Sequence, residues 1–256
     1  MLRFLVVLLV ALAASSVGFK KYVWFISIGY GFAIALLGVV LLVMFREQLD
    51  AGTTLICALL VIYGIRLGGY LTYRELRTSS YGKRMKGEIK DGSEMSLGAK
   101  CGIWAGASIL YACEVSPVFF RLSDGYGANV SVIIGALVMV VGLVVESTAD
   151  LQKQRAKRAN PRQFVRTGLF GFVRCPNYLG ELLFWTGVFV TGFGALHGLV
   201  QWLVALVGYL GIIFVMFSGA RRLEIRQNKT YGSDPEYRRY VSTVPIMIPF
   251  VHLYSV

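Results

Sequence analysis

Long apolar runs separated by short polar segments cover most of the chain. Each run approaches the roughly 20 residues that an α-helix needs to cross about 30 Å of hydrocarbon. None of the runs alternates with the period of two that marks a lipid-facing β-strand. The pattern therefore predicts an all-α fold, an integral membrane bundle of about seven transmembrane helices. The expected spans are 3–19, 22–45, 51–73, 98–120, 126–147, 177–195 and 198–219.

The first apolar run has two interpretations. Arg3, a short apolar core and the letters ALAASS are typical of a cleaved signal peptide. The second run begins directly after Lys20 and Lys21, which favours a retained first helix instead. We expect the N-terminal segment to be the first transmembrane helix.

Composition and charge placement support and orient this bundle. Hydrophobic residues make up 56% of the chain and charged residues 16%, against about 25% charged in soluble domains. Of the 26 Lys and Arg, 22 fall in the segments 20–21, 74–100, 148–176 and beyond 220. The positive-inside rule puts these segments in the cytosol. We expect the N-terminus outside and the C-terminus cytosolic, in a bacterial inner membrane rather than the endoplasmic reticulum.

The net charge of +12 has a plain explanation in this topology. It reflects the Lys and Arg that orient the helices in the membrane by staying in the cytosol, where they contact membrane lipid. Nucleic acid is a poor partner, because no basic stripe alternates with exposed aromatic side chains. The four cysteines and two histidines show no metal-ligand spacing, so we predict no metal site.

Polar side chains inside apolar spans are costly, and each needs a partner or a ligand. Tyr63, Arg66 and Tyr70 share one face of the third span. Glu114 stands in the fourth span, just before Pro117, which distorts a helix. Arg66 and Glu114 are explained equally well by a buried structural ion pair and by a functional site.

The end of the fifth span carries a second polar group. Glu146 and Asp150 share a helix face, and a basic run follows at 153–158. Alone, that run is equally typical of attachment to anionic lipid. The whole segment 148–176 also contains glycines and aromatic residues, and it resembles a shaped loop over an anionic ligand. Arginine forks and backbone N–H groups bind phosphates well.

The start of the sixth span complements that loop. Asn177 lies near the helix N-terminus, where the dipole favours negative charge. Glu181, one turn further in, is suited to accept from an amide or a hydroxyl. A nicotinamide dinucleotide phosphate has both a polyanionic and an amide-bearing end. No G-x-G-x-x-G motif follows a strand, so this cofactor would not be held by a Rossmann domain.

Three ordered stretches resemble the C-terminal half of the steroid 5α-reductase family, and more closely its bacterial-type branch. They are ESTADLQKQ, GLFGFVRCPNYLGELLFWTG and SGARRLEIRQNKTYGSDPEYRRYVSTVPIMIPF, within residues 140–250, with a fainter match at YGIRL in the third span. The resemblance implies a seven-helix membrane fold and NADPH-dependent reduction of a carbon–carbon double bond conjugated to a carbonyl. The substrate would be a hydrophobic molecule that enters from the bilayer.

The resemblance also implies roles for individual residues. The chain is expected to be a single membrane domain, 1–256, with 140–250 as its cofactor-binding half. Tyr63 matches the tyrosine that binds the substrate carbonyl. Glu114 matches no motif position and is the expected catalytic partner because it is an acidic group in the fourth span. The NADPH-binding residues expected from the motif positions are Glu146, Asp150, Gln154, Lys157, Arg166, Arg174, Asn177, Tyr178, Glu181, Arg221, Arg222, Glu224, Tyr237 and Tyr240.

Two departures from the family pattern bear on activity. Cys175 stands where the bacterial-type relatives have His, which removes a hydrogen-bond donor. Family reductases also pair the tyrosine with a glutamine–glutamate couple on the preceding helix, whereas here the nearest Glu-Gln is Glu47-Gln48 in a short outer loop. Either Glu114 takes that role or the substrate is not a 3-oxo steroid.

Two other classes of protein stay open. Isoprenylcysteine and phospholipid methyltransferases share the R-x-P-x-Y-x-G turn and bind S-adenosylmethionine. The Glu directly after NYLG and the upstream AD-x-Q-K favour the reductase. A non-catalytic membrane protein or a transporter would explain the departures, but it leaves the polar residues without a role.

Overall fold

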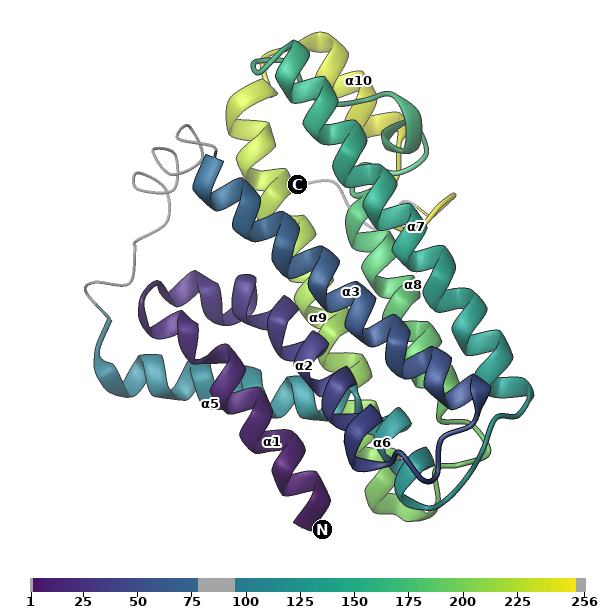
Figure 1. The fold of residues 1–256 in the computed structure, drawn as a ribbon. Helices are drawn as coiled ribbons and strands as arrows, with labels where there is room; N and C mark the ends of the chain where they lie inside the picture. The colour runs from purple at the N-terminus through teal and green to yellow at the C-terminus, as the bar shows by residue number, and fades with distance from the viewer. Residues whose placement is uncertain (1, 78–94, 252–256) are drawn as a thin grey trace. The chain divides into compact units, whose positions relative to one another are not determined.

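The computed structural model describes residues 2–77 and 95–251 (Figure 1). Its described residues form helices and connecting turns, with no strand among them. The α-helices are α1 (Leu2–Ser15), α2 (Ile28–Met44), α3 (Ala51–Arg77), α5 (Leu97–Glu114), α6 (Ser116–Ser123), α7 (Val130–Ala159), α8 (Pro176–Thr191), α9 (Gly198–Tyr231) and α10 (Pro235–Thr243). Short 3-10 helices are η1 (Ser16–Phe19), η2 (Tyr22–Ile26) and η3 (Gly168–Gly171).

Several of these helices are long and apolar enough to cross a membrane. Among the described residues five helices qualify by length and composition, or six if a bent pair counts as one span. The five are Leu2–Phe19, Tyr22–Met44, Ala51–Leu76, Val130–Ala159 and Gly198–Tyr231. The expectation of an all-helical, multi-pass membrane protein is thereby confirmed. Helix α8, which covers most of the predicted sixth span, has 16 residues.

The bent pair is the predicted fourth span. Helix α5 begins at the N-cap Ser96, whose side chain accepts from the Ala99 N–H, and ends at Glu114. Helix α6 continues after Val115 at an angle of 52°. Pro117 lies in the first turn of α6, where its missing N–H costs no helical hydrogen bond. The predicted distortion at Pro117 is therefore a break between two helices.

The chain forms two compact units. Unit 1 comprises Met1–Ala136 and Val188–Tyr209, and unit 2 comprises Leu137–Gly187 and Leu210–Val256. Residues 188–209, inside the predicted cofactor-binding half, thus cluster with the N-terminal part of the chain.

In unit 1 helices α2 and α3 cross at glycines (Figure 1). A Cβ added to Gly31 would lie 2.5 Å from the Gly68 N, and one added to Gly64 would meet the backbone of Ala35. Only glycine permits such an approach, since real side chains keep a larger separation. The crossing therefore depends on these residues.

Arg121 organises the loops of unit 1. The sequence suggests an ordinary outer-loop charge, but the structure shows a fully buried side chain at the end of α6. Its Nε donates to the Thr191 carbonyl at 2.7 Å and its Nη2 to the Phe193 carbonyl at 3.0 Å. Further donors reach the Gly127 carbonyl and the Asn129 Oδ1. These acceptors replace water, which explains how a guanidinium can be buried there.

Candidate functional site

Buried charge is concentrated in unit 2. Five charged side chains of this unit are at most 8% exposed: Glu146, Asp150, Arg174, Glu181 and Glu224. They come from α7, from the loop before α8, from α8 and from α9. All five belong to the set predicted from the motif positions. Buried charges are expensive, so the unit holds them for a structural or a functional reason.

Two glycines bring the acidic residues of α7 close to α8. A Cβ added to Gly142 would lie 2.5 Å from the Phe184 N, and one added to Gly180 would lie 2.5 Å from the Glu146 N. The two helix backbones are thus in direct contact. Glu146 packs against Gly180, the residue that precedes Glu181. The structure therefore brings the α7 and α8 motifs together.

Two oxygen atoms at this site accept no hydrogen bond. Within the described part of the chain, neither the Asn177 Oδ1 nor the Glu224 Oε2 has a partner, although both atoms are buried. Asn177 is in the first turn of α8, and Glu224 is on α9. An unsatisfied buried polar atom costs about 1–3 kcal/mol, which a donor on a ligand would recover. Both residues are thus suited to accept from an amide or a hydroxyl.

The loop before α8 has a defined shape. Gly168 has a φ of +65°, a conformation that favours glycine. The Leu169 N–H donates to the Gln152 Oε1 at 2.9 Å, and a Cβ on Gly168 would lie 2.5 Å from that same oxygen. Gln152 therefore holds the loop. Sequence reasoning selected Gln154 and missed Gln152, because nothing in the pattern links it to the glycine 16 positions later.

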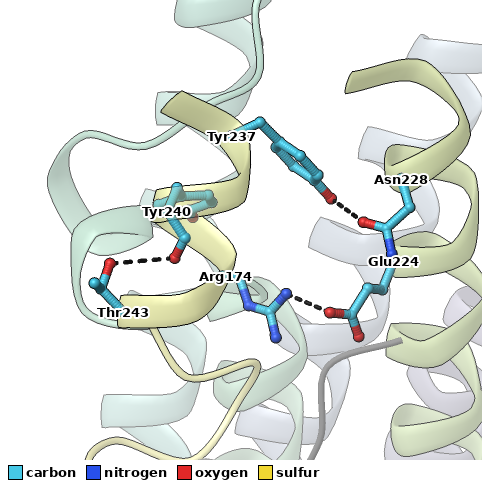
Figure 2. A network of polar contacts seen from close by, with 6 residues as sticks. All are labelled: Arg174, Glu224, Asn228, Tyr237, Tyr240 and Thr243. Atoms are coloured by element: carbon cyan, nitrogen blue, oxygen red, sulfur yellow. Dashed lines mark hydrogen bonds and ion pairs between the residues drawn. The ribbon is translucent and has the colours of Figure 1, made fainter. Parts of the chain in front are cut away.

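Polar contacts tie the C-terminal segment to this loop and to α9, and those made by Glu224 and Asn228 of α9 are drawn in Figure 2. Arg174 forms a buried ion pair with Glu224 of α9. The Tyr237 hydroxyl donates to the Asn228 Oδ1 at 2.8 Å (Figure 2). The Tyr240 hydroxyl donates to the Phe170 carbonyl at 2.7 Å. These predicted cofactor residues thus connect the loop, α9 and α10.

Backbone contacts complete the attachment. The Arg174 N–H donates to the Pro245 carbonyl at 2.9 Å, and the Cys175 N–H donates to the Ile246 carbonyl at 2.8 Å. The segment after α10 therefore pairs with the residues directly before α8. Burial raises the pKa of the Cys175 thiol to about 11, so this thiol stays protonated near neutral pH.

An aromatic cluster surrounds the α10 tyrosines. The Phe164 ring lies 5.2 Å from that of Tyr237 and 5.4 Å from that of Tyr240, measured between centroids, and Tyr231 joins them. Burial raises the pKa of Tyr237 to about 12 and also raises the pKa of Tyr240. Both phenols are therefore neutral at physiological pH.

Two of the predicted phosphate-binding cations already serve the fold. The Lys157 Nζ donates to the Gln163 carbonyl at 2.6 Å, to the Tyr231 hydroxyl at 2.9 Å and to the Pro161 carbonyl at 3.3 Å. An ammonium has three protons, so a phosphate would have to displace one of these acceptors. Arg166 pairs with Glu236 of α10 at 2.7 Å.

The remaining predicted cofactor residues have different surroundings. Arg221 and Arg222 are exposed on α9, and Gln154 is half-buried on α7. Tyr178 packs against α9, where a Cβ added to Gly219 would lie 3.5 Å from its ring. The guanidiniums of Arg221 and Arg222 are therefore accessible to an anion.

The two predicted catalytic residues lie in unit 1, and both are buried. Tyr63 is 0% exposed on α3, and Glu114 is 3% exposed at the last position of α5. The Tyr63 hydroxyl lies 3.0 Å from the Tyr30 hydroxyl of α2. Glu47 and Gln48 are exposed between α2 and α3.

Comparisons with known proteins give a family and one curated relative. A family model described as "Protein of unknown function (DUF1295)" matches residues 15–244. The steroid 5-alpha-reductase DET2 of Arabidopsis thaliana is 28% identical over 123 residues, which are 47% of this chain and 42% of the relative. The match thus spans about two-fifths of that relative's length. No solved structure matches the chain.

Proposed function

We propose that this chain, which belongs to the family described as "Protein of unknown function (DUF1295)", is a membrane-embedded reductase. It reduces a carbon–carbon double bond conjugated to a carbonyl in a hydrophobic substrate and uses NADPH. The similarity to a plant steroid 5-alpha-reductase supports the reductase class. The substrate is steroid-like or isoprenoid-like and reaches the protein from the bilayer.

The observation that carries this proposal is the buried charge of unit 2. Glu146 and Asp150 on α7 and Glu181 on α8 are buried, and the glycine crossing places the α7 carboxylate Glu146 against α8. Acidic groups gathered in an apolar unit are suited to accept hydrogen bonds from a ligand with several donors.

The residues present fit a nicotinamide dinucleotide phosphate. Such a cofactor needs acceptors for its carboxamide and cations for its phosphates. Asn177 and Glu181 supply acceptors near the start of α8, and the Asn177 Oδ1 has no hydrogen-bond partner among the described residues. Arg221 and Arg222 supply exposed guanidiniums, and guanidiniums bind phosphate bidentately. When bound, NADPH would supply the hydride for the β-carbon, and water would supply the proton for the α-carbon.

The substrate end of the reaction falls to unit 1. Tyr63 donates a hydrogen bond to the substrate carbonyl, where negative charge develops as the double bond is reduced. Glu114 is buried at the α5–α6 break and supports the polar end of the substrate. The role of Tyr63 comes from the motif resemblance and that of Glu114 from its place in an apolar span, and burial in an apolar unit would strengthen each hydrogen bond.

The topology we propose has seven spans. The five long helices and the bent α5–α6 pair supply six, and α8 with the turn after it supplies the seventh. With the N-terminus outside, the segments richest in Lys and Arg lie in the cytosol. The cofactor loop before α8 is then also cytosolic, where NADPH is available.

A ligand titration of the detergent-purified protein tests the cofactor. NADPH, NADH and S-adenosylmethionine are compared by thermal shift, since a ligand that binds the folded state stabilises it by mass action. We expect a shift with NADPH that exceeds the shift with NADH. S-adenosylmethionine alone producing a shift would refute the reductase and identify a methyltransferase.

Variants of two site residues test the proposed contacts with NADPH directly. Glu181→Gln and Asn177→Ala should each weaken NADPH binding at least tenfold, which removes about 1.4 kcal/mol of binding free energy. Glu47→Gln and Asn160→Ala make the same chemical changes at exposed positions and should leave the affinity unchanged. Equal affinities in all four variants would contradict the proposed site.

A further inference from the structure

The basic run 153–158 lies at the end of α7, and the structure divides it between two faces of the helix. One face turns into unit 2, where Glu146 and Asp150 are buried and Lys153 is half-buried. Lys157, one turn further, makes three hydrogen bonds within that unit. These residues follow one another at steps of three or four, so they share a face. This half of the run therefore packs with the rest of the unit.

The opposite face of α7 is apolar and exposed. Leu137, Val144 and Leu151 are 62%, 56% and 52% exposed, and each follows the last by seven residues, which is close to two helical turns. Helix α7 is long and apolar enough to cross a membrane. Lipid tails are as apolar as leucine, so they solvate such a face at no cost. The stripe therefore marks the side of α7 that faces the bilayer.

Two arginines continue this stripe where its apolar residues end. Arg155 lies four residues after Leu151 and Arg158 lies seven residues after it, so both are on the face of the stripe. Both side chains are exposed, and α7 ends at Ala159. The stripe thus changes from apolar to basic within two turns and stays on one face.

The distances along the helix suit the headgroup layer of a membrane. A rise of about 1.5 Å per residue puts Arg155 about 6 Å and Arg158 about 10 Å beyond Leu151 along the axis. The polar headgroup layer is about 5–7 Å thick on each side of the hydrocarbon. Helical side chains also lean toward the N-terminus of their helix, which for these arginines is back toward the bilayer. Both guanidiniums are therefore within reach of lipid phosphates.

Arg155 has no acidic partner among the residues that the structure describes. In the same unit Arg166 pairs with Glu236 and Arg174 pairs with Glu224. A guanidinium can form two parallel hydrogen bonds with a phosphate, and its charge complements the anionic lipids of the cytosolic leaflet. An exposed guanidinium of this kind, next to a lipid-facing stripe, is suited to bind a phospholipid.

We propose that Leu151, Arg155 and Arg158 form a docking surface for anionic phospholipids of the cytosolic leaflet. The acyl chains lie against the apolar stripe, and the phosphate lies on the guanidiniums. The run 153–158 then has two roles, because its inner cations pack within unit 2 and its outer cations bind lipid. The surface uses none of the proposed cofactor residues and does not depend on the reductase activity.

Native mass spectrometry in a neutral detergent measures the bound lipid directly. Phosphatidylglycerol and phosphatidylcholine with the same acyl chains differ in charge, and we expect the wild type to retain several times more phosphatidylglycerol. Arg155→Gln should lower that retention about fivefold, the effect of one Arg near an anionic surface. Adding Arg158→Gln should lower it further. Arg162→Gln removes the same charge from an exposed position beyond the end of α7 and should stay close to the wild type.

Three further measurements separate lipid binding from folding. Arg155→Lys keeps the charge and should retain most of the phosphatidylglycerol. Without added lipid, both Arg155 variants should unfold at the wild-type temperature, because the substituted side chain is exposed. Higher salt should lower the phosphatidylglycerol retained by the wild type, since exposed charges are screened.

Equal retention of the two lipids by the wild type would overturn the proposal. Equal retention of phosphatidylglycerol by Arg155→Gln and Arg162→Gln would overturn it as well. Release of the lipid by millimolar inorganic phosphate would identify a site for a soluble anion instead of a lipid surface. None of these samples contains NADPH, so the results do not depend on whether the protein binds the cofactor.

Discussion

The buried ion pair between Arg174 and Glu224 should be the most important polar contact for the stability of unit 2. The two side chains are 5% and 2% exposed. Arg174 belongs to the loop before α8, and Glu224 belongs to α9. The Arg174 backbone also donates to Pro245, beyond α10. A change at this pair should therefore loosen the loop and the C-terminal segment together.

The expected magnitude follows from the burial. Arg174→Met leaves the Glu224 carboxylate buried without its cation, and Glu224→Met leaves a buried guanidinium without its anion. Breaking a buried pair by removing one partner costs about 3–5 kcal/mol, which corresponds to a fall of about 6–20 °C in Tm for a chain of this size. Replacing both partners removes both charges, so Arg174→Met with Glu224→Met should cost less than either single change.

Thermal unfolding in detergent, followed by tryptophan fluorescence, measures the three variants. Arg166→Met is the matched control, because it breaks a pair with Glu236 whose side chains are 41% and 64% exposed. An exposed pair contributes about 0–1 kcal/mol, so the control should lower Tm by a few degrees at most. Limited proteolysis should cut the C-terminal segment first in the single variants.

Two results would refute this reasoning. If Arg174→Met lowers Tm no more than Arg166→Met, burial does not set the strength of the pair. If the double variant loses as much as the sum of the two single variants, the side chains do not interact energetically.

Other changes have equally definite expectations. Gly180→Ala should destabilise the protein by about 1–3 kcal/mol or more through overpacking. Gly102→Ala places its new Cβ with nothing within 4 Å, so it should be neutral or stabilise by up to about 1 kcal/mol. The Tm of each variant, measured against the wild type, tests this difference. Burial raises the pKa of Tyr237 from 10.0 to about 12, so the stability linked to its neutral form is complete below pH 10 and is lost as the pH rises through 12. Tyr237→Phe should flatten that part of a plot of Tm against pH. Arg121→Met should cost about 3 kcal/mol or more, because several buried acceptors lose their donor, while Arg46→Met at an exposed position should leave the unfolding midpoint unchanged.

Hydrophobic runs were enough to predict the helical membrane architecture. The length and apolarity of a span are properties of one continuous segment, and the penalty for burying charge in hydrocarbon applies to each residue separately. Glu146, Asp150 and Glu181 could therefore be selected before any contact was known, and all three are buried. The order of the motifs along the chain added Arg174 and Glu224 to that group.

The partners of these residues required the tertiary structure. Helical periodicity assigns a side chain to a face but does not say which other helix faces it. Lys157 was expected to bind phosphate, yet its protons reach Gln163 and Tyr231. The break at Val115 was indicated only as a distortion near Pro117, because its angle depends on what the two helices pack against.

Three contributions were invisible in the sequence because they depend on contacts between distant segments. Gln152 shapes the loop through Leu169, Arg121 joins the segment 127–129 to the end of α8, and Tyr30 meets Tyr63 across the α2–α3 crossing. An amide, a charge near a helix end and a tyrosine in an apolar run look ordinary along the chain. The pattern along the chain was sufficient to predict the membrane environment, the helices and the candidates for buried charge. Which donor meets which acceptor depends on how the chain folds, because hydrogen bonds require distances that no local pattern specifies.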